Sequence, residues 1–142
     1  MVSHAAPNSP YDTSKLRRLW LPFLTSLPIY AAILFLVDSG SSSSNPGFLR
    51  MFTIVLGTLA FAELLFVFLA KGLLASLTGG NYQTFCIVRW ALLESIAVFG
   101  LILHFVGASA MTGLVFLAVA LATLVISGPK PDEAAEVAPA RH

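Results

Sequence analysis

Four apolar blocks, each about long enough to cross a lipid bilayer, limit what this chain can fold into. A helix needs about 20 residues to span the hydrocarbon core. Because lipid offers the backbone no hydrogen-bond partners, a spanning segment must be a helix or part of a closed barrel, and the alternating short strands of a barrel are not visible here. The blocks cover residues 19–37, 51–70, 85–106 and 108–127. We therefore predict an all-α membrane protein, a four-transmembrane-helix bundle over residues 15–127.

The amino-acid composition is typical of an integral membrane protein. The chain is 57% hydrophobic and 11% charged, whereas a soluble domain carries about 25% charged residues. The formal net charge is +1, and there is no basic tract of the kind that binds nucleic acid. The lipid bilayer is therefore the first partner that we expect, and nucleic acid is not one.

The sequence contains no recognisable catalytic or metal-binding motif. A Ser/His/Asp set, a metal-ligand cluster and a phosphate-binding glycine loop are all missing. His104 is the one histidine in the apolar blocks, and a haem-binding bundle would usually need two axial ligands. The single cysteine, Cys86, fits a small buried apolar residue. We expect no enzymatic activity, no catalytic residues, no metal and no cofactor.

Polar segments separate and flank the blocks. Residues 1–14 and residues 128–142 are rich in polar residues and Pro, and we predict that both are disordered. The Ser-rich stretch 38–47 is predicted to be a flexible loop. Residues 71–80 are predicted to be a second loop, closed by glycines, and Gly107 marks a tight connection between the last two helices.

Lys and Arg residues fall mainly on one side of the predicted membrane. With four spans, both termini and the second loop share that side, and the opposite side has only Arg50. The basic residues of the first side are Lys15, Arg17, Arg18, Lys71 and Lys130, with Arg141 further out. The positive-inside rule then places both termini in the cytoplasm. We expect a multi-pass protein of the inner (cytoplasmic) membrane of a bacterium.

Small and aromatic residues suggest how the helices pack. Small residues four positions apart allow two membrane helices to approach closely, and Trp and Tyr favour the membrane–water interface. The predicted packing pairs are Ser109 with Gly113 and Ala118 with Ala122. The predicted interface anchors are Trp20, Tyr30, Tyr82 and Trp90.

Glu94 is the most informative single residue, because it lies near the middle of the third apolar block. With a rise of about 1.5 Å per residue, it lies about 14 Å from the cytoplasmic end of that block, in a core about 30 Å thick. A carboxyl at this depth costs about 2.5–3.5 kcal/mol on insertion scales and usually has a partner, a cavity or a proton. Glu94 is therefore our candidate proton- or ion-binding residue.

Glu63 and Arg89 form a second pair of charges in the apolar blocks. Measured from the same face, Arg89 lies about 6 Å deep and Glu63 about 10 Å deep. Arg89 and Glu94 are about 140° apart around their helix and do not share a face. We predict that Arg89 and Glu63 form a structural ion pair, or that Arg89 extends to the cytoplasmic surface.

Without a cation beside it, Glu94 in low-dielectric surroundings would favour its neutral, protonated form. Three interpretations of this residue stay open. It is a proton or ion site, a structural carboxyl hydrogen-bonded to a neighbouring helix, or part of a site that another subunit completes.

The region around Glu94 has a distinctive pattern, an acidic residue followed by an apolar stretch with an aromatic-Gly-Leu step. It reads Leu92-Leu93-Glu94-Ser95-Ile96-Ala97-Val98-Phe99-Gly100-Leu101-Ile102. This stretch resembles the carboxyl-bearing helix of the proteolipid subunit c of rotary ATP synthases. The resemblance implies that Glu94 corresponds to the proton- or sodium-binding carboxylate of that family. The chain is also similar to small four-helix bacterial membrane proteins described as subunit c-like.

Three functions are compatible with the sequence. The second block has Gly57 and large residues such as Phe61 where subunit c has a glycine run, so an accessory, assembly or ion-handling component of a membrane complex is expected in preference to a ring subunit. Such a component would be a homo-oligomer or part of a larger membrane complex. The alternatives are a proton-coupled small four-helix transporter and a purely structural membrane scaffold.

Overall fold

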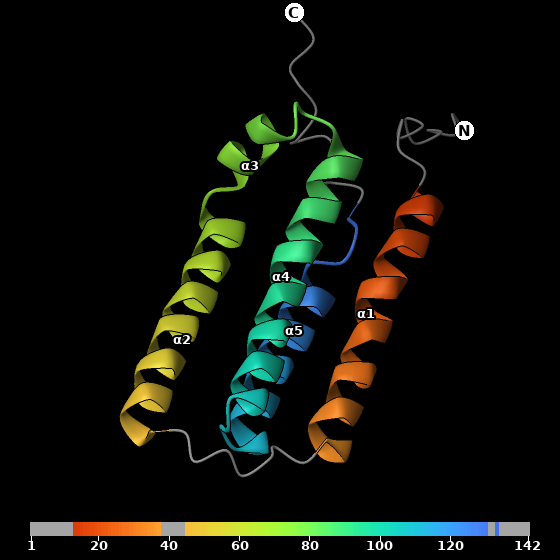
Figure 1. Ribbon diagram of the computed structural model, residues 1–142. Helices are drawn as coiled ribbons and strands as arrows, with labels where there is room; N and C mark the ends of the chain where they lie inside the picture. The colour runs from red at the N-terminus through yellow and green to blue at the C-terminus, as the bar shows by residue number, and fades with distance from the viewer. Residues whose placement is uncertain (1–12, 38–44, 131–132, 134–142) are drawn as a thin grey trace, which may run out of the picture.

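The computed structural model describes residues 13–37, 45–130 and 133, and every regular element in these ranges is a helix. The helices are α1 (Thr13–Leu36), α2 (Pro46–Leu69), α3 (Lys71–Leu77), α4 (Tyr82–Phe105) and α5 (Ala110–Ile126). Figure 1 shows α4 between α2 and α1, with α5 behind it. The all-α prediction is confirmed for the described residues. Most of the two segments predicted to be disordered, and residues 38–44 of the first loop, lie outside them.

Three of the helices are long and apolar enough to cross a membrane. They are Ser14–Leu36 of α1, which has 23 residues, and the whole of α2 and α4, which have 24 each. The fourth predicted span corresponds to α5, an apolar helix of 17 residues, which is about 26 Å long. The structure thus fits a membrane protein with three long apolar helices.

Helix α2 begins earlier than the apolar block that predicted it. The block starts at residue 51, but the helix starts at Pro46. Asn45 caps it, and its side-chain oxygen accepts a hydrogen bond of 2.9 Å from the backbone N–H of Gly47. Asn at the cap followed by Pro in the first turn is a strong start signal, so the end of the predicted loop belongs to the helix.

Side-chain caps of the same kind begin α4 and α5, whereas Ala70 at the start of α3 makes no side-chain cap. The Asn81 side chain accepts a hydrogen bond of 3.2 Å from the backbone N–H of Thr84 at the start of α4. The Ser109 hydroxyl accepts one of 3.3 Å from the backbone N–H of Thr112 at the start of α5. These side chains satisfy backbone donors that have no partner within the helix.

The segment predicted to be the second loop contains the short helix α3. Leu74 on this helix is buried against the end of the bundle, where α3 contacts both α2 and α4 (Figure 1). Gly79 and Gly80 then end the helix with φ of +62° and +71°, which only glycine adopts readily. The prediction of a loop was wrong for Lys71–Leu77.

Helix α4 packs against α1, α2 and α5 and is the central helix of the bundle. Its contact with α5 is very close: a methyl group on Gly100 would lie 2.8 Å from the carbonyl oxygen of Gly113. A methyl group on Gly113 would lie 2.7 Å from a methyl carbon of Leu34 in α1. These two glycines therefore bring three helices together. The tight turn between α4 and α5 contains Gly107, with φ of +106°, as predicted.

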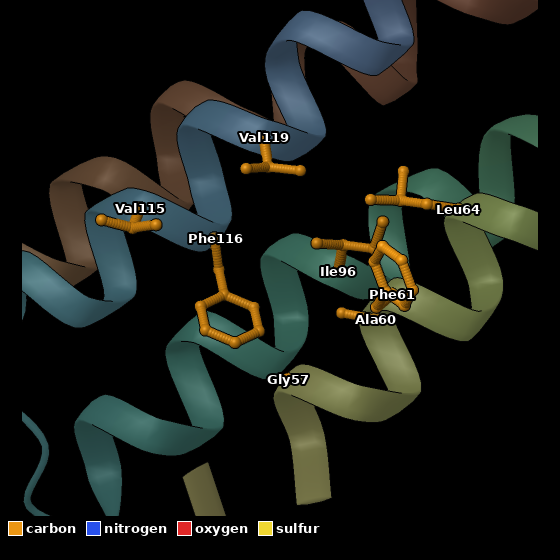
Figure 2. Close-up of a pocket in the computed structure, with 8 residues that line it drawn as sticks. All are labelled: Gly57, Ala60, Phe61, Leu64, Ile96, Val115, Phe116 and Val119. Atoms are coloured by element: carbon orange, nitrogen blue, oxygen red, sulfur yellow. The ribbon is translucent and has the colours of Figure 1, made fainter. Parts of the chain in front are cut away.

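A shallow apolar groove of about 210 Å³ lies between α2 and α5. Figure 2 shows side chains from both helices around it, together with Ile96 of α4. The lining residues are Gly57, Ala60, Phe61, Leu64, Ile96, Val115, Phe116 and Val119. Because all of these are apolar, the groove offers no hydrogen bond or charge to a polar ligand.

Candidate functional site

Glu94 lies at the midpoint of α4 and is half-buried. Its Oε1 atom accepts a hydrogen bond of 2.9 Å from the hydroxyl of Tyr30 on α1. Tyr30 is also half-buried and packs against the main hydrophobic core. The carboxyl that the sequence singled out therefore has a neutral partner on a different helix.

The helical geometry of α4 directs Glu94 and Ser95, which are adjacent in the sequence, toward different helices. Consecutive residues on a helix are about 100° apart. Glu94 contacts Tyr30 of α1, whereas Ser95 contacts Glu63 of α2. Figure 1 shows α1 and α2 on the two sides of α4. The two glutamates of the apolar helices are therefore held in separate environments, on opposite flanks of the central helix.

Arg89 is paired near the end of the bundle that carries α3. Its Nη1 atom lies 2.9 Å from Oε2 of Glu133, and the Nζ atom of Lys71 lies 3.4 Å from Oε1 of the same carboxylate. The Arg89 side chain is 3% exposed and that of Glu133 is 13% exposed. The guanidinium also lies 5.7 Å from the ring centre of Phe68, within range of a cation–π contact. One carboxylate thus binds two cations.

Glu94 has no salt bridge within the described part of the chain. The nearest basic residue on its own helix, Arg89, forms a salt bridge with Glu133 instead. Glu94 must therefore be stabilised at this depth by a neutral hydrogen bond, by a proton, or by both.

The predicted ion pair between Glu63 and Arg89 is not formed among the described residues. Instead, the hydroxyl of Ser95 lies 2.6 Å from Oε2 of Glu63, and Arg89 contacts Glu133. In this respect the prediction was wrong about the partners of both residues. Arg89 also stays buried and does not extend to the surface.

The position of α3 explains the difference. The prediction aligned the end of α2, at residue 70, with Phe85 on the next helix. With α3 folded over the end of the bundle, Phe68 of α2 instead lies level with Arg89, and Glu63 lies level with Ser95. Ser95 is six residues beyond Arg89, or about 9 Å along the axis. Glu63 is therefore too far along the bundle to reach the guanidinium.

The last turn of α5 and the residues after it are hydrogen-bonded to the same end of the bundle. The indole N–H of Trp90 donates to the carbonyl of Ser127 at 2.9 Å, and that of Trp20 donates to the carbonyl of Leu124 at 3.3 Å. The hydroxyl of Tyr82 donates to the carbonyl of Lys130 at 2.7 Å. These contacts bring the start of the predicted tail back over α4, where Glu133 meets Arg89.

Sequence reasoning did not assign the partners Tyr30, Ser95 and Glu133. Tyr30 was assigned to the interface, although its place well inside the first block signals a deeper position. Ser95 is next to Glu94, and a single serine in an apolar stretch does not indicate which helix it will contact. Glu133 lies in a Pro- and Ala-rich stretch with no periodic pattern that would indicate a contact with the bundle.

Two further chemically active side chains are buried elsewhere. The Nε2 atom of His104 lies 2.9 Å from the carbonyl oxygen of Val37, just after α1. Since a carbonyl only accepts, Nε2 carries the proton of this bond. Cys86 is buried and free. No group of three or more potential ligands for a metal ion occurs in the ranges that the structure describes.

Comparisons with protein-family models, with curated proteins and with solved structures find no match to this chain.

Proposed function

We propose that Glu94 is a proton-binding carboxyl in a small multi-span membrane protein, which serves as an accessory, assembly or ion-handling component of a membrane complex. One observation carries the proposal. A half-buried carboxyl at the midpoint of a long apolar helix has a neutral phenol as its partner, while Arg89 and Lys71 bind Glu133. Proton binding then removes the cost of a charge at that depth.

The partner suits a carboxyl that changes its protonation state. The Tyr30 hydroxyl can donate to a carboxylate oxygen or to the carbonyl oxygen of the protonated acid. Glu94 can therefore gain or lose a proton without losing the hydrogen bond to α1. A cation in place of Tyr30 would instead favour the ionised form alone.

The proposed topology has four spans, with α5 as the fourth and both termini in the cytoplasm. Helix α5 packs along α4 through Gly100 and Gly113, and about 26 Å of apolar helix falls within the range of known spans. The basic residues around the starts of α1 and α3 and after α5 support this orientation. The inner membrane of a bacterium is the proposed location.

Carbodiimide labelling in native membranes across a pH series tests the proposal, because the reagent attacks protonated carboxyls in apolar surroundings. Mass spectrometry of the peptides separates Glu94 from Glu63. We expect labelling of Glu94 that decreases as the pH rises, and loss of that modification in Glu94→Gln. Labelling of Tyr30→Phe is expected to persist, since the carboxyl stays at the same depth. Absence of labelling at Glu94 at every pH would contradict the proposal.

A purely structural scaffold is the second candidate, and the hydrogen bonds between helices favour it. Glu94 joins α4 to α1, and Glu63 joins α4 to α2. A scaffold would keep its stability and its assembly in Glu94→Gln, because the amide oxygen still accepts from Tyr30. A complex component would migrate far above 15.1 kDa in native mass measurements. Assembly without pH-dependent labelling would favour the scaffold.

A further inference from the structure

The carboxyl of Glu63 lies in a short chain of three oxygen atoms. The Oγ atom of Ser95 is 2.6 Å from Oε2 of Glu63 and 2.6 Å from the carbonyl oxygen of Leu92. Both separations are within the range of O–H···O hydrogen bonds. The two contacts are therefore either two separate hydrogen bonds or one hydrogen shared between two acceptors.

The number of available hydrogens favours one protonation state of Glu63. A serine hydroxyl has one hydrogen and two lone pairs, and a backbone carbonyl can only accept. With an ionised Glu63, the single Ser95 hydrogen would be shared between two acceptors across the two 2.6 Å contacts. A protonated Glu63 supplies a second hydrogen, so that each contact has its own.

The charges on the neighbouring helices do not compensate an ionised Glu63. Helices α4 and α3 pack against α2. Their Arg and Lys residues are Arg89 and Lys71, and both bind Glu133, while His104 at the far end of α4 contacts the carbonyl of Val37. The other carboxyl of α4, Glu94, is directed to Tyr30 on the opposite flank. Within the described ranges, Glu63 takes part in no salt bridge. Glu63 is half-buried, and an unpaired carboxylate in the apolar part of a membrane helix is costly.

We propose that Glu63 is a second proton-binding site, a neutral carboxylic acid that donates its hydrogen to Ser95. Ser95 in turn donates to the carbonyl of Leu92, so every oxygen in the chain is satisfied. The ligand of this site is one proton, held on the α2 flank of α4. The assignment rests on the geometry of Glu63 alone and does not depend on the role of Glu94.

Infrared spectroscopy of the full-length protein in lipid bilayers tests this assignment, because protonated carboxyls and carboxylates absorb in separate regions. With isotope-labelled glutamate at neutral pH, we expect a protonated-carboxyl band that Glu63→Gln removes and Glu94→Gln leaves in place. The glutamine amide can donate to Ser95, so the variant should fold. A circular dichroism melt checks that it does.

Ser95→Ala provides an independent measurement. If Glu63 donates to Ser95, loss of the acceptor shifts the Glu63 carbonyl band to higher frequency. If Glu63 is ionised and accepts from Ser95, only carboxylate bands change. A wild-type spectrum with no protonated band that Glu63→Gln removes would overturn the inference. Because the two carboxyls are distinguished by separate variants, failure of the Glu94 proposal would leave this result unaffected.

Discussion

At the scale of single residues, the three charged side chains inside the apolar helices, Glu63, Arg89 and Glu94, each have a partner on another element, and the partner determines the chemistry. Glu94 accepts a hydrogen bond from the phenol of Tyr30, Glu63 is hydrogen-bonded to a serine, and Arg89 forms a salt bridge with a carboxylate. In low-dielectric surroundings such pairings matter more than they do in water. Carboxyl groups of the same type can therefore have different roles a short distance apart.

The buried pair of Arg89 and Glu133 is predicted to be important for stability. Glu133→Ala should lower the free energy of unfolding by about 3–5 kcal/mol, because it leaves a buried guanidinium without its carboxylate. Detergent-titration unfolding in mixed micelles, followed by tryptophan fluorescence, measures the change.

The matched control for this pair is Lys71→Ala, since the Lys71 side chain is 45% exposed and its contact should contribute at most about 1 kcal/mol. The double variant Arg89→Met with Glu133→Ala should recover most of the loss, because no buried charge remains. An effect of Glu133→Ala no larger than that of Lys71→Ala would show that the pair does not hold the end of the bundle together.

The bond from Tyr30 to Glu94 is predicted to make a small contribution to stability. Hydrogen bonds between membrane helices contribute about 0.6 kcal/mol on average, so Tyr30→Phe should lower the free energy of unfolding by about that amount. The same unfolding assay applies. Thr25→Ala on the same helix is a suitable control, because its hydroxyl bonds only within α1, to the carbonyl of Pro22. A loss beyond about 2 kcal/mol would mean that Tyr30 has a larger structural role.

At the scale of the helices, the contact between α4 and α5 depends on two glycines. The sequence pattern identified Gly113 as a packing residue, and the structure confirms it. The other members of the predicted pairs behave differently: Ser109 caps α5, and Ala118 and Ala122 are exposed. The partner of Gly113, Gly100, was not predicted, because a single small residue on a helix does not show which helix it will face.

Substitution of Gly100 by Ala is predicted to destabilise the bundle by about 1–3 kcal/mol, the usual cost of excess volume in a packed core. The new methyl group would lie 2.8 Å from a backbone oxygen, which cannot move aside easily. Gly57→Ala is the control, because nothing lies within 4 Å of a methyl group there. Thermal melting of both variants in the same detergent compares them. Equal melting temperatures would contradict the close approach of α4 and α5.

At the scale of the whole molecule, most of the Lys and Arg residues lie at the end that carries α3. The segment after α5 is hydrogen-bonded to α4 at the same end. The opposite end holds Arg50 as its one Lys or Arg residue in the described ranges. This asymmetry supports the proposed orientation. In the proposed orientation, the Arg89 and Glu133 pair lies between the cytoplasmic surface and the two carboxyls, Glu94 and Glu63.

Cysteine accessibility tests the proposed topology. In a Cys86→Ser background, Ser76→Cys on α3 and Lys130→Cys after α5 should react with a membrane-impermeant maleimide only after the cells are broken. Asn45→Cys and Ser109→Cys, at the opposite end, should react in intact spheroplasts. All four parent residues are exposed in the bundle, so reactivity reports the side of the membrane. Reaction of Lys130→Cys from outside would exclude α5 as a fourth span.

The sequence by itself determined the helical class, the approximate positions of the long helices and the place of Glu94 near the middle of its helix. All of these depend on distances along one chain, since block length and helical rise are local properties. Only the tertiary structure decided which residues pair with Glu63, Arg89 and Glu94. These hydrogen bonds and ion pairs depend on how far one helix is displaced along another. The short helix α3 sets that displacement between α2 and α4, and the segment after α5 supplies Glu133 to Arg89. Glu63 consequently meets Ser95, and Glu94 is left with the neutral hydroxyl of Tyr30.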